Sequence, residues 1–135
     1  MPVKVLFRGA RYSICGWLGE DNSCAVEDFI LSLDASNNSD SGALIYELEK
    51  TSNHGTSQNQ QKFRYLKGNG QGLVEFKARG GSRVLGFIDP QRRRIVCTHG
   101  TPKVKPRRFD REIETALEIK DEYLIETMEE GKYVH

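Results

Sequence analysis

Three short apolar runs in the second half of the chain constrain the fold more than any other feature. Residues 73–76, 84–88 and 95–98 are rich in β-branched and aromatic side chains. The dipeptides Gly80-Gly81 and Asp89-Pro90, which are typical of turns, separate these runs. Short apolar runs between turn residues are typical of strands joined by hairpins. This stretch therefore predicts an antiparallel meander of strands.

Positive charge is concentrated on the same stretch. Residues 62–111 carry fourteen Lys and Arg against three Asp and Glu, a net charge of +11. Residues 1–61 have a net charge of −4 and residues 112–135 one of −6, so the overall charge of +1 hides a strong segregation. Uncompensated positive charge of this size attracts polyanions, and nucleic acid is the first candidate. In the alternative, the acidic last segment neutralises it, within the molecule or in a neighbouring copy, or an acidic partner protein does so.

Two helices are predicted before the meander and one after it. In residues 24–35, apolar side chains recur at intervals of three and four, which indicates an amphipathic helix. Residues 43–50 repeat the pattern after the polar hinge 36–42, so the two helices are expected to form a helical hairpin. A last helix with an acidic outer face is predicted over residues 108–130.

Shorter segments complete the expected fold. Apolar runs at residues 3–7 and 12–18 predict either a hairpin or one broken strand at the edge of the sheet. Residues 51–62 are polar and predict a surface loop, and residues 63–67 predict a short strand or a loop arm. We expect an α+β fold in which the helical hairpin packs on a small twisted antiparallel sheet, followed by a C-terminal helix.

Length and composition bound the class of protein. With 135 residues, the chain suits a single domain with its own core, spanning residues 1–135. The chain has an odd number of cysteines, Cys15, Cys24 and Cys97, and none of them forms a CxxC motif. This pattern indicates reduced thiols and no disulfide framework. The N-terminus lacks the apolar core of a signal peptide, and no run approaches the ~18 apolar residues of a membrane span. We therefore expect a cytoplasmic protein without a membrane partner.

His99 is the clearest candidate for proton transfer. It follows the last apolar run and precedes several lysines. Imidazole titrates near neutrality, and a positioned general acid or base accelerates such reactions by ~10²–10⁴. The alternative is a packing or hydrogen-bonding role, which is common for a single histidine at a strand end. Glu75 lies within a basic strand and is expected to pair with Arg83 or Lys77 more readily than to act as a base.

Two tyrosines lie near basic positions. Tyr12 and Tyr65 are each expected either to stack on a nucleobase or, more simply, to pack against the fold. Phosphate-binding loops, HExxH helices, nucleophile elbows and metal-ligand spacings do not occur in the sequence. We therefore expect neither a metal nor a nucleotide cofactor.

Four motifs between residues 63 and 124 occur in the order of a known family. Residues 72–77 are GLVEFK, and residues 82–87 are SRVLGF. Residues 95–105 are IVCTHGTPKVK, and Pro106 precedes REIETA at residues 111–116. This order resembles the RelE/HigB toxin superfamily, in particular its phage-derived HigB-like branch. Each motif alone is weak, so their order carries the resemblance.

The resemblance implies a RelE-like fold and a ribosome-dependent mRNA endonuclease, neutralised by a helix-turn-helix antitoxin. In such toxins the 2′-hydroxyl of the mRNA attacks the adjacent phosphate without a metal, and positioned cations balance the charge of the transition state. Carried over by position, the resemblance implies catalytic roles for Lys77, Arg83 and His99. Further cations of this region are expected to bind nucleic acid: Arg64, Lys67, Arg79, Arg92, Arg93, Arg94, Lys103, Lys105, Arg107 and Arg108.

The motifs depart from the family pattern at several positions. Ser82 stands where the family has a tyrosine, and Thr101-Pro102 where it has a phenylalanine. Lys77 replaces an arginine, which keeps the charge but loses the guanidinium fork. Two alternatives stay open beside the nuclease. One is a non-catalytic RNA- or DNA-binding protein on the same scaffold, and the other is a toxin of this superfamily that inhibits DNA gyrase.

Overall fold

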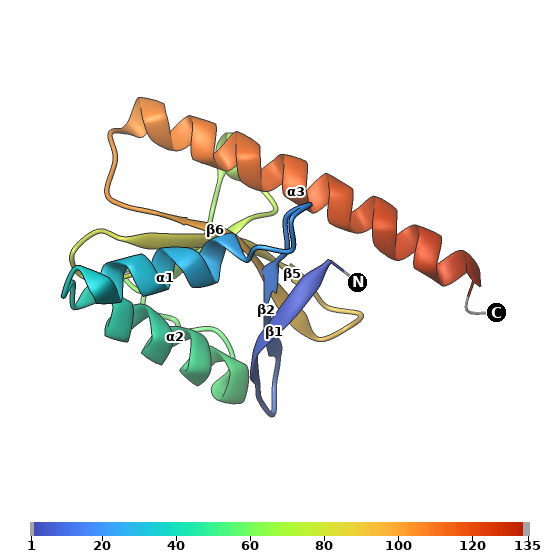
Figure 1. Ribbon diagram of the computed structural model, residues 1–135, viewed down its shortest axis with the longest axis horizontal. Helices are drawn as coiled ribbons and strands as arrows, with labels where there is room; N and C mark the ends of the chain where they lie inside the picture. Colours follow the sequence, from blue (N-terminus) through green and yellow to red (C-terminus); the bar gives the residue numbers. More distant parts are fainter. Residues whose placement is uncertain (1, 134–135) are drawn as a thin grey trace.

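The computed structural model describes residues 2–133 and has the expected α+β architecture (Figure 1). The helices are α1 (Ala25–Ala35), α2 (Asp40–His54) and α3 (Pro106–Tyr133), with a short 3-10 turn η1 (Gly68–Gly70). The strands are β1 (Val3–Arg8), β2 (Ser13–Trp17), β3 (Phe63–Tyr65), β4 (Val74–Lys77), β5 (Arg83–Asp89) and β6 (Arg94–Thr101).

Within the described residues, the strands form one open six-stranded sheet in the order β1-β2-β6-β5-β4-β3. The predicted meander is confirmed, because β4, β5 and β6 pair in antiparallel fashion, and so is the predicted N-terminal hairpin of β1 and β2. The sheet is mixed, however, since β2 and β6 are parallel, with Ile14 opposite Ile95. A parallel pair needs a long crossover connection, and the helical hairpin of α1 and α2 supplies the start of it.

Different helices cover the two faces of the sheet (Figure 1). α1 and α2 lie on one face, over a core that includes Val84 and Ile95. α3 crosses the opposite face and packs on Leu85, Phe87 and Val96. Neighbouring residues along β5 and β6 thus enter different cores, as the two-residue period of a strand requires. Both faces of the meander are buried, which explains its nearly continuous apolar runs.

α2 extends beyond both ends of the predicted helix and runs over Asp40–His54. At its start, the buried carboxylate of Asp40 accepts hydrogen bonds from the backbone N–H groups of Gly80 (3.0 Å) and Ser82 (3.2 Å). Near its end, the carbonyl of Ser52 accepts two backbone hydrogen bonds from the β1–β2 turn. These contacts with distant segments order the polar flanks that hydrophobic periodicity assigned to a hinge and a loop.

The three cysteines are buried free thiols, as predicted. Burial raises the pKa of the Cys97 thiol well above its ordinary value, so this thiol stays protonated at neutral pH. Across residues 2–133, no helix combines the length and the apolar character that crossing a membrane requires.

A polar contact fastens α3 to the end of β5. The Tyr123 hydroxyl donates to Asp89, and Arg92 Nη1 donates to the same carboxylate over 3.1 Å. Burial and the bond to Asp89 raise the pKa of Tyr123 to about 12, so the phenol remains a donor at neutral pH. Burial acts to raise the pKa of Asp89, but the hydrogen bonds from Tyr123 and Arg92 outweigh it and hold that pKa below its ordinary value.

Replacing Tyr123 by Phe tests this contact. The ring, which packs edge-on against Phe87 with centroids 5.1 Å apart, is kept, and only the hydroxyl is lost. We expect the free energy of unfolding to fall by roughly 1–3 kcal/mol, because Asp89 loses a donor in a buried position. Urea denaturation followed by circular dichroism measures the change. Tyr46→Phe, at a ring that is 60% exposed, is the control and should match the wild type.

Acid titration tests the carboxylate itself. Because the folded-state pKa of Asp89 is lowered, its contribution to stability is complete above the unfolded-state pKa, near 3.8, and is lost as the pH falls through the lowered value. The stability difference between the wild type and Asp89→Asn should therefore be constant from pH 5 to 7 and shrink below about pH 4. A difference that does not change with pH contradicts this assignment.

Candidate nucleic-acid interface

Most of the predicted cations meet at one end of the sheet. Lys77 at the end of β4 is paired with Arg83 at the start of β5, and Arg83 is paired with Thr101 at the end of β6. Gly81 in the β4–β5 turn lies against Lys103, since a Cβ at Gly81 would be 2.7 Å from the Lys103 Cβ. We call this region the basic end and define it by Lys77, Arg79, Arg83, Lys103, Lys105, Arg107 and Arg108.

The start of α3 adds to the positive field of the basic end. α3 begins at Pro106, a residue suited to the first helical position, and its first turn contains no acidic residue. The N-terminus of a helix carries a partial positive charge, which acidic side chains commonly offset. Here Arg107 and Arg108 occupy the first turn, so the side chains and the helix dipole both attract anions.

Most cations of the basic end are available to a partner. Arg79, Lys103, Lys105, Arg107 and Arg108 are exposed, and Lys77 is half-buried. None of these six forms an ion pair with a carboxylate of the described residues. Within the described part of the molecule, the acidic face of α3 therefore makes no direct ion pair with these cations.

Arg83 is held beneath α3. Its guanidinium lies over the ring of Phe109, with Cζ 4.6 Å from the ring centroid, and its side chain is 16% exposed. Nη1 donates to Glu75 over 3.4 Å, and the fully buried Glu75 also accepts a bond from Arg64 Nε over 2.8 Å. The predicted ion pair between Glu75 and Arg83 is thus confirmed. Among the described residues, the buried Arg83 Nε has no hydrogen-bond partner, so this donor is left unsatisfied in the closed site.

His99 lies on the same face as Arg83 because of a β-bulge. Leu85 is opposite His99 and Gly86 is opposite Cys97, so Thr98 is an extra residue in β6. Cys97 belongs to the core under α1 and α2, and without the extra residue His99 would point to that face as well. The bulge turns His99 towards α3.

Both ring nitrogens of His99 have partners. Nε2 is 2.7 Å from the Glu112 carboxylate of α3, and Nδ1 is 3.0 Å from the Thr98 hydroxyl. A carboxylate on one nitrogen fixes the orientation of the ring and favours a proton on that nitrogen. The sequence analysis did not identify Glu112, which binds His99, or Phe109, which lies over Arg83, as parts of this site. Their spacing of three residues, which places both on one face of α3, is the signal that could have shown it.

The other predicted residues lie around this centre or away from it. Lys77 is next to Arg83 in register, yet it lines a groove at the edge of the sheet with Lys62 and Arg79. Arg64 is joined to the centre through Glu75, and Lys67 lies beyond β3.

The β5–β6 turn separates three predicted cations from the rest. Arg92, Arg93 and Arg94 lie at the opposite end of β5 from Arg83, roughly 20 Å away along a seven-residue strand. They bind groups of the fold: Arg92 pairs with Asp89, Arg93 donates to a β1–β2 turn carbonyl over 3.3 Å, and Arg94 donates to the Tyr123 hydroxyl over 3.3 Å. The structure does not bring these three arginines to the basic end.

The two tyrosines differ in their surroundings. Tyr12 is half-buried and packs against the core under α1 and α2, as the simpler prediction had it. Tyr65 is 61% exposed and packs only at the rim of the fold, edge-on against Phe63 with ring centroids 5.4 Å apart, so most of its ring stays open to a partner. Among the described residues, no three or more His, Cys, Asp or Glu side chains are grouped so that they could hold a metal ion.

Comparisons with known proteins add no family assignment. No protein-family model matches the chain, and neither the curated proteins nor the solved structures gave a significant match.

Substitution of Glu75 tests the centre of the site. Glu75→Ala removes the one carboxylate among the described residues that is bound to Arg83 and leaves a largely buried guanidinium without it, so stability should fall by roughly 3–5 kcal/mol. Glu75→Gln, which keeps an acceptor of the same shape, should lose less. Thermal and urea unfolding measure both. Glu27→Ala, which breaks the exposed pair with Lys4, is the control and should leave stability unchanged within error. If Glu75→Ala and Glu27→Ala lower the free energy of unfolding equally, the buried ion pair contributes no more to stability than the exposed one.

Proposed function

We propose that this chain is a toxin of the RelE/HigB type that cleaves mRNA on translating ribosomes. One observation carries the proposal: Arg83 and His99, which the motifs assign to the scissile phosphate and the proton, share one face of the sheet beside a set of exposed, unpaired cations. They are diagonal neighbours on paired strands, because Arg83 is opposite Thr101 and His99 is opposite Leu85. Diagonal neighbours lie about 7–8 Å apart, close enough for both side chains to reach one phosphate group.

In the proposed reaction, the ribose 2′-oxygen attacks the adjacent phosphorus and the bond from phosphorus to the 5′-oxygen breaks. The 2′-hydroxyl proton passes to His99, and the leaving 5′-oxygen takes up a proton from water. The products are a 2′,3′-cyclic phosphate and a 5′-hydroxyl end. Arg83 and Lys77 balance the charge that develops on the phosphate oxygens, and His99 moves the proton. Lys103 and Lys105 bind flanking phosphates.

The arrangement of α3 sets a condition on this reaction. Glu112 occupies His99 Nε2, and Phe109 covers the guanidinium of Arg83. RNA reaches these groups when the first turns of α3 move aside or when the phosphate displaces Glu112. The proposal implies a cytoplasmic protein close to ribosomes and neutralisation by a helix-turn-helix antitoxin.

A second candidate is RNA binding without cleavage. The observation that favours it is the pairing of the reactive groups with protein partners: both ring nitrogens of His99 and one arm of Arg83 are engaged. The exposed cations of the basic end bind a phosphate backbone in either case.

Expression of the chain alone in bacteria tests the first candidate. We expect growth arrest and mRNA fragments with 5′-hydroxyl ends, mapped by sequencing of RNA ends. Lys103→Gln/Lys105→Gln should relieve the arrest, whereas Arg92→Gln/Arg93→Gln, which removes the same charge at the far end of β5, should not. His99→Gln should lower cleavage of mRNA on purified ribosomes by roughly 10²–10⁴ while RNA binding is kept.

Each outcome separates the candidates. Normal growth with intact transcripts, together with RNA binding in vitro, favours the second. Equal relief by the two double glutamine variants would mean that the basic end has no special role, and absence of RNA binding by the purified wild type would remove both candidates. Thermal melts of every variant exclude loss of the fold as the cause.

A further inference from the structure

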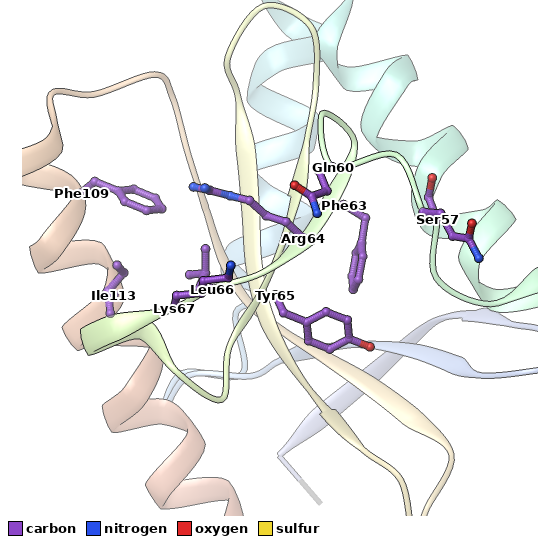
Figure 2. A pocket seen from close by; sticks show the side chains of 10 residues that line it. Ser57, Gln60, Phe63, Arg64, Tyr65, Leu66, Lys67, Phe109 and Ile113 are labelled. Atoms are coloured by element: carbon purple, nitrogen blue, oxygen red, sulfur yellow. The ribbon is translucent and has the colours of Figure 1, made fainter.

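A groove of about 560 Å³ runs along β3, next to the basic end (Figure 2). β3 is the last strand in the sheet order, so the edge that faces away from β4 is free. Successive side chains of the segment point to opposite sides: Arg64 extends towards Phe109 of α3, and Tyr65 points the other way (Figure 2). The groove therefore wraps over the edge of the sheet. It is lined by Ser57, Gln58, Gln60, Phe63, Arg64, Tyr65, Leu66, Lys67, Phe109 and Ile113.

The lining combines three kinds of group. Leu66, Phe109 and Ile113 form an apolar wall on the α3 side. Gln58 and Gln60 offer amide donors and acceptors, and Arg64 and Lys67 offer positive charge. None of the lining residues, all of which belong to the described part of the chain, carries a carboxylate. Apolar surface, amides and cations without acidic groups suit a ligand that is planar, rich in hydrogen-bonding edges and negatively charged.

We propose that this groove binds a nucleobase and its flanking phosphates, as a subsite for the single-stranded RNA held at the basic end. This inference rests on the proposed RNA binding. Tyr65 supplies the stacking surface, since its ring is 61% exposed and is supported from the side by Phe63, with centroids 5.4 Å apart and ring planes at 87°. Phe63 is itself buried against Phe76, so the support is rigid. Arg64 and Lys67 bind the phosphates on either side of the base.

The groove is continuous with the centre of the site. Arg64 and Arg83 bind the two oxygens of Glu75 from opposite sides, at 2.8 Å and 3.4 Å. β3 and β5 flank β4, so the backbones of the two arginines are about two strand spacings, or roughly 10 Å, apart, and their guanidinium groups, which share one carboxylate, lie closer together. An RNA strand whose phosphate lies at Arg83 therefore meets Arg64 and then the groove within its next nucleotides.

RNA fits this edge better than a peptide strand does. A peptide that adds to a sheet gains affinity from main-chain hydrogen bonds along the edge. β3 contains three residues, and the outward N–H of Phe63 already bonds to the carbonyl of Asn59. Few backbone groups are left for an added strand, whereas the exposed ring and the cations on side chains remain for a nucleotide.

Binding of the full-length chain to a fluorescein-labelled single-stranded RNA of twelve mixed-sequence nucleotides tests the groove, with fluorescence anisotropy as the readout. Tyr65→Ala should weaken binding roughly tenfold, because stacking on one base is lost. Tyr65→Phe, which keeps the ring, should bind like the wild type. Leu31→Ala, at an exposed apolar side chain of α1 (59% exposed) that lines neither this groove nor the groove of Lys77 and Arg79, should stay within about twofold. Photocrosslinking with 4-thiouridine RNA should label the peptide that contains Tyr65.

The outcomes distinguish the groove from the proposed function. If Tyr65→Ala binds RNA like the wild type while Lys103→Gln/Lys105→Gln does not, the basic end binds RNA and the groove is no subsite. Equal losses for Tyr65→Ala and Leu31→Ala also overturn the assignment to this groove. If the wild type binds no RNA but binds an acidic peptide, and Tyr65→Ala abolishes that binding, the groove is a peptide site and both proposals fail. Because Tyr65 is exposed, these variants should keep the fold, which circular dichroism checks.

Discussion

One buried carboxylate organises the candidate site. Glu75 has no exposed surface and binds Arg64 from β3 and Arg83 from β5. Burying a carboxylate without a partner costs several kcal/mol of folding free energy. Folding of the sheet is therefore strongly favoured when both guanidinium groups bind Glu75. The spacing of Arg64 and Arg83 is thereby set by the register of β3, β4 and β5. It does not depend on the conformation of a loop. The backbone N–H groups of Gly80 and Ser82 donate hydrogen bonds to the Asp40 carboxylate, and these bonds fix the β4–β5 turn that leads into Arg83.

The antiparallel arrangement of the meander explains why positive charge gathers at one end. The end of β4, the start of β5 and the end of β6 meet there, so Arg83 lies between Lys77 of β4 and Thr101 of β6, and Lys103 lies against Gly81 of the β4–β5 turn. Like charges held this close repel one another and lower the stability of the fold, and a bound polyanion relieves that repulsion. Carboxylates of the described residues form no direct ion pair with the exposed cations there, and the proposed function assigns this role to an RNA phosphate backbone.

The class of the fold, the meander, the helical hairpin and the last helix followed from hydrophobic periodicity and turn residues. Sequence patterns did not predict the features that depend on contacts between segments far apart in the chain. The parallel pairing of β2 with β6 depends on a crossover that local patterns do not encode, and α2 is lengthened by hydrogen bonds to the β4–β5 and β1–β2 turns. In the site, residues 92–94 looked like part of one basic cluster, yet a strand of seven residues separates them from Arg83. The bulge at Thr98 turns His99 to the face of Arg83, and no local sequence signal predicted this bulge.

The central claim is that the basic end binds a phosphate backbone, and the salt dependence of RNA affinity tests it most directly. For single-stranded RNA, the logarithm of the binding constant falls with the logarithm of the salt concentration by about 0.7 for each phosphate neutralised. The account predicts that Lys103→Gln/Lys105→Gln makes this slope shallower by about 1.4, while Arg92→Gln/Arg93→Gln leaves it at the wild-type value. A slope that neither pair alters, or that both alter equally, would contradict the account.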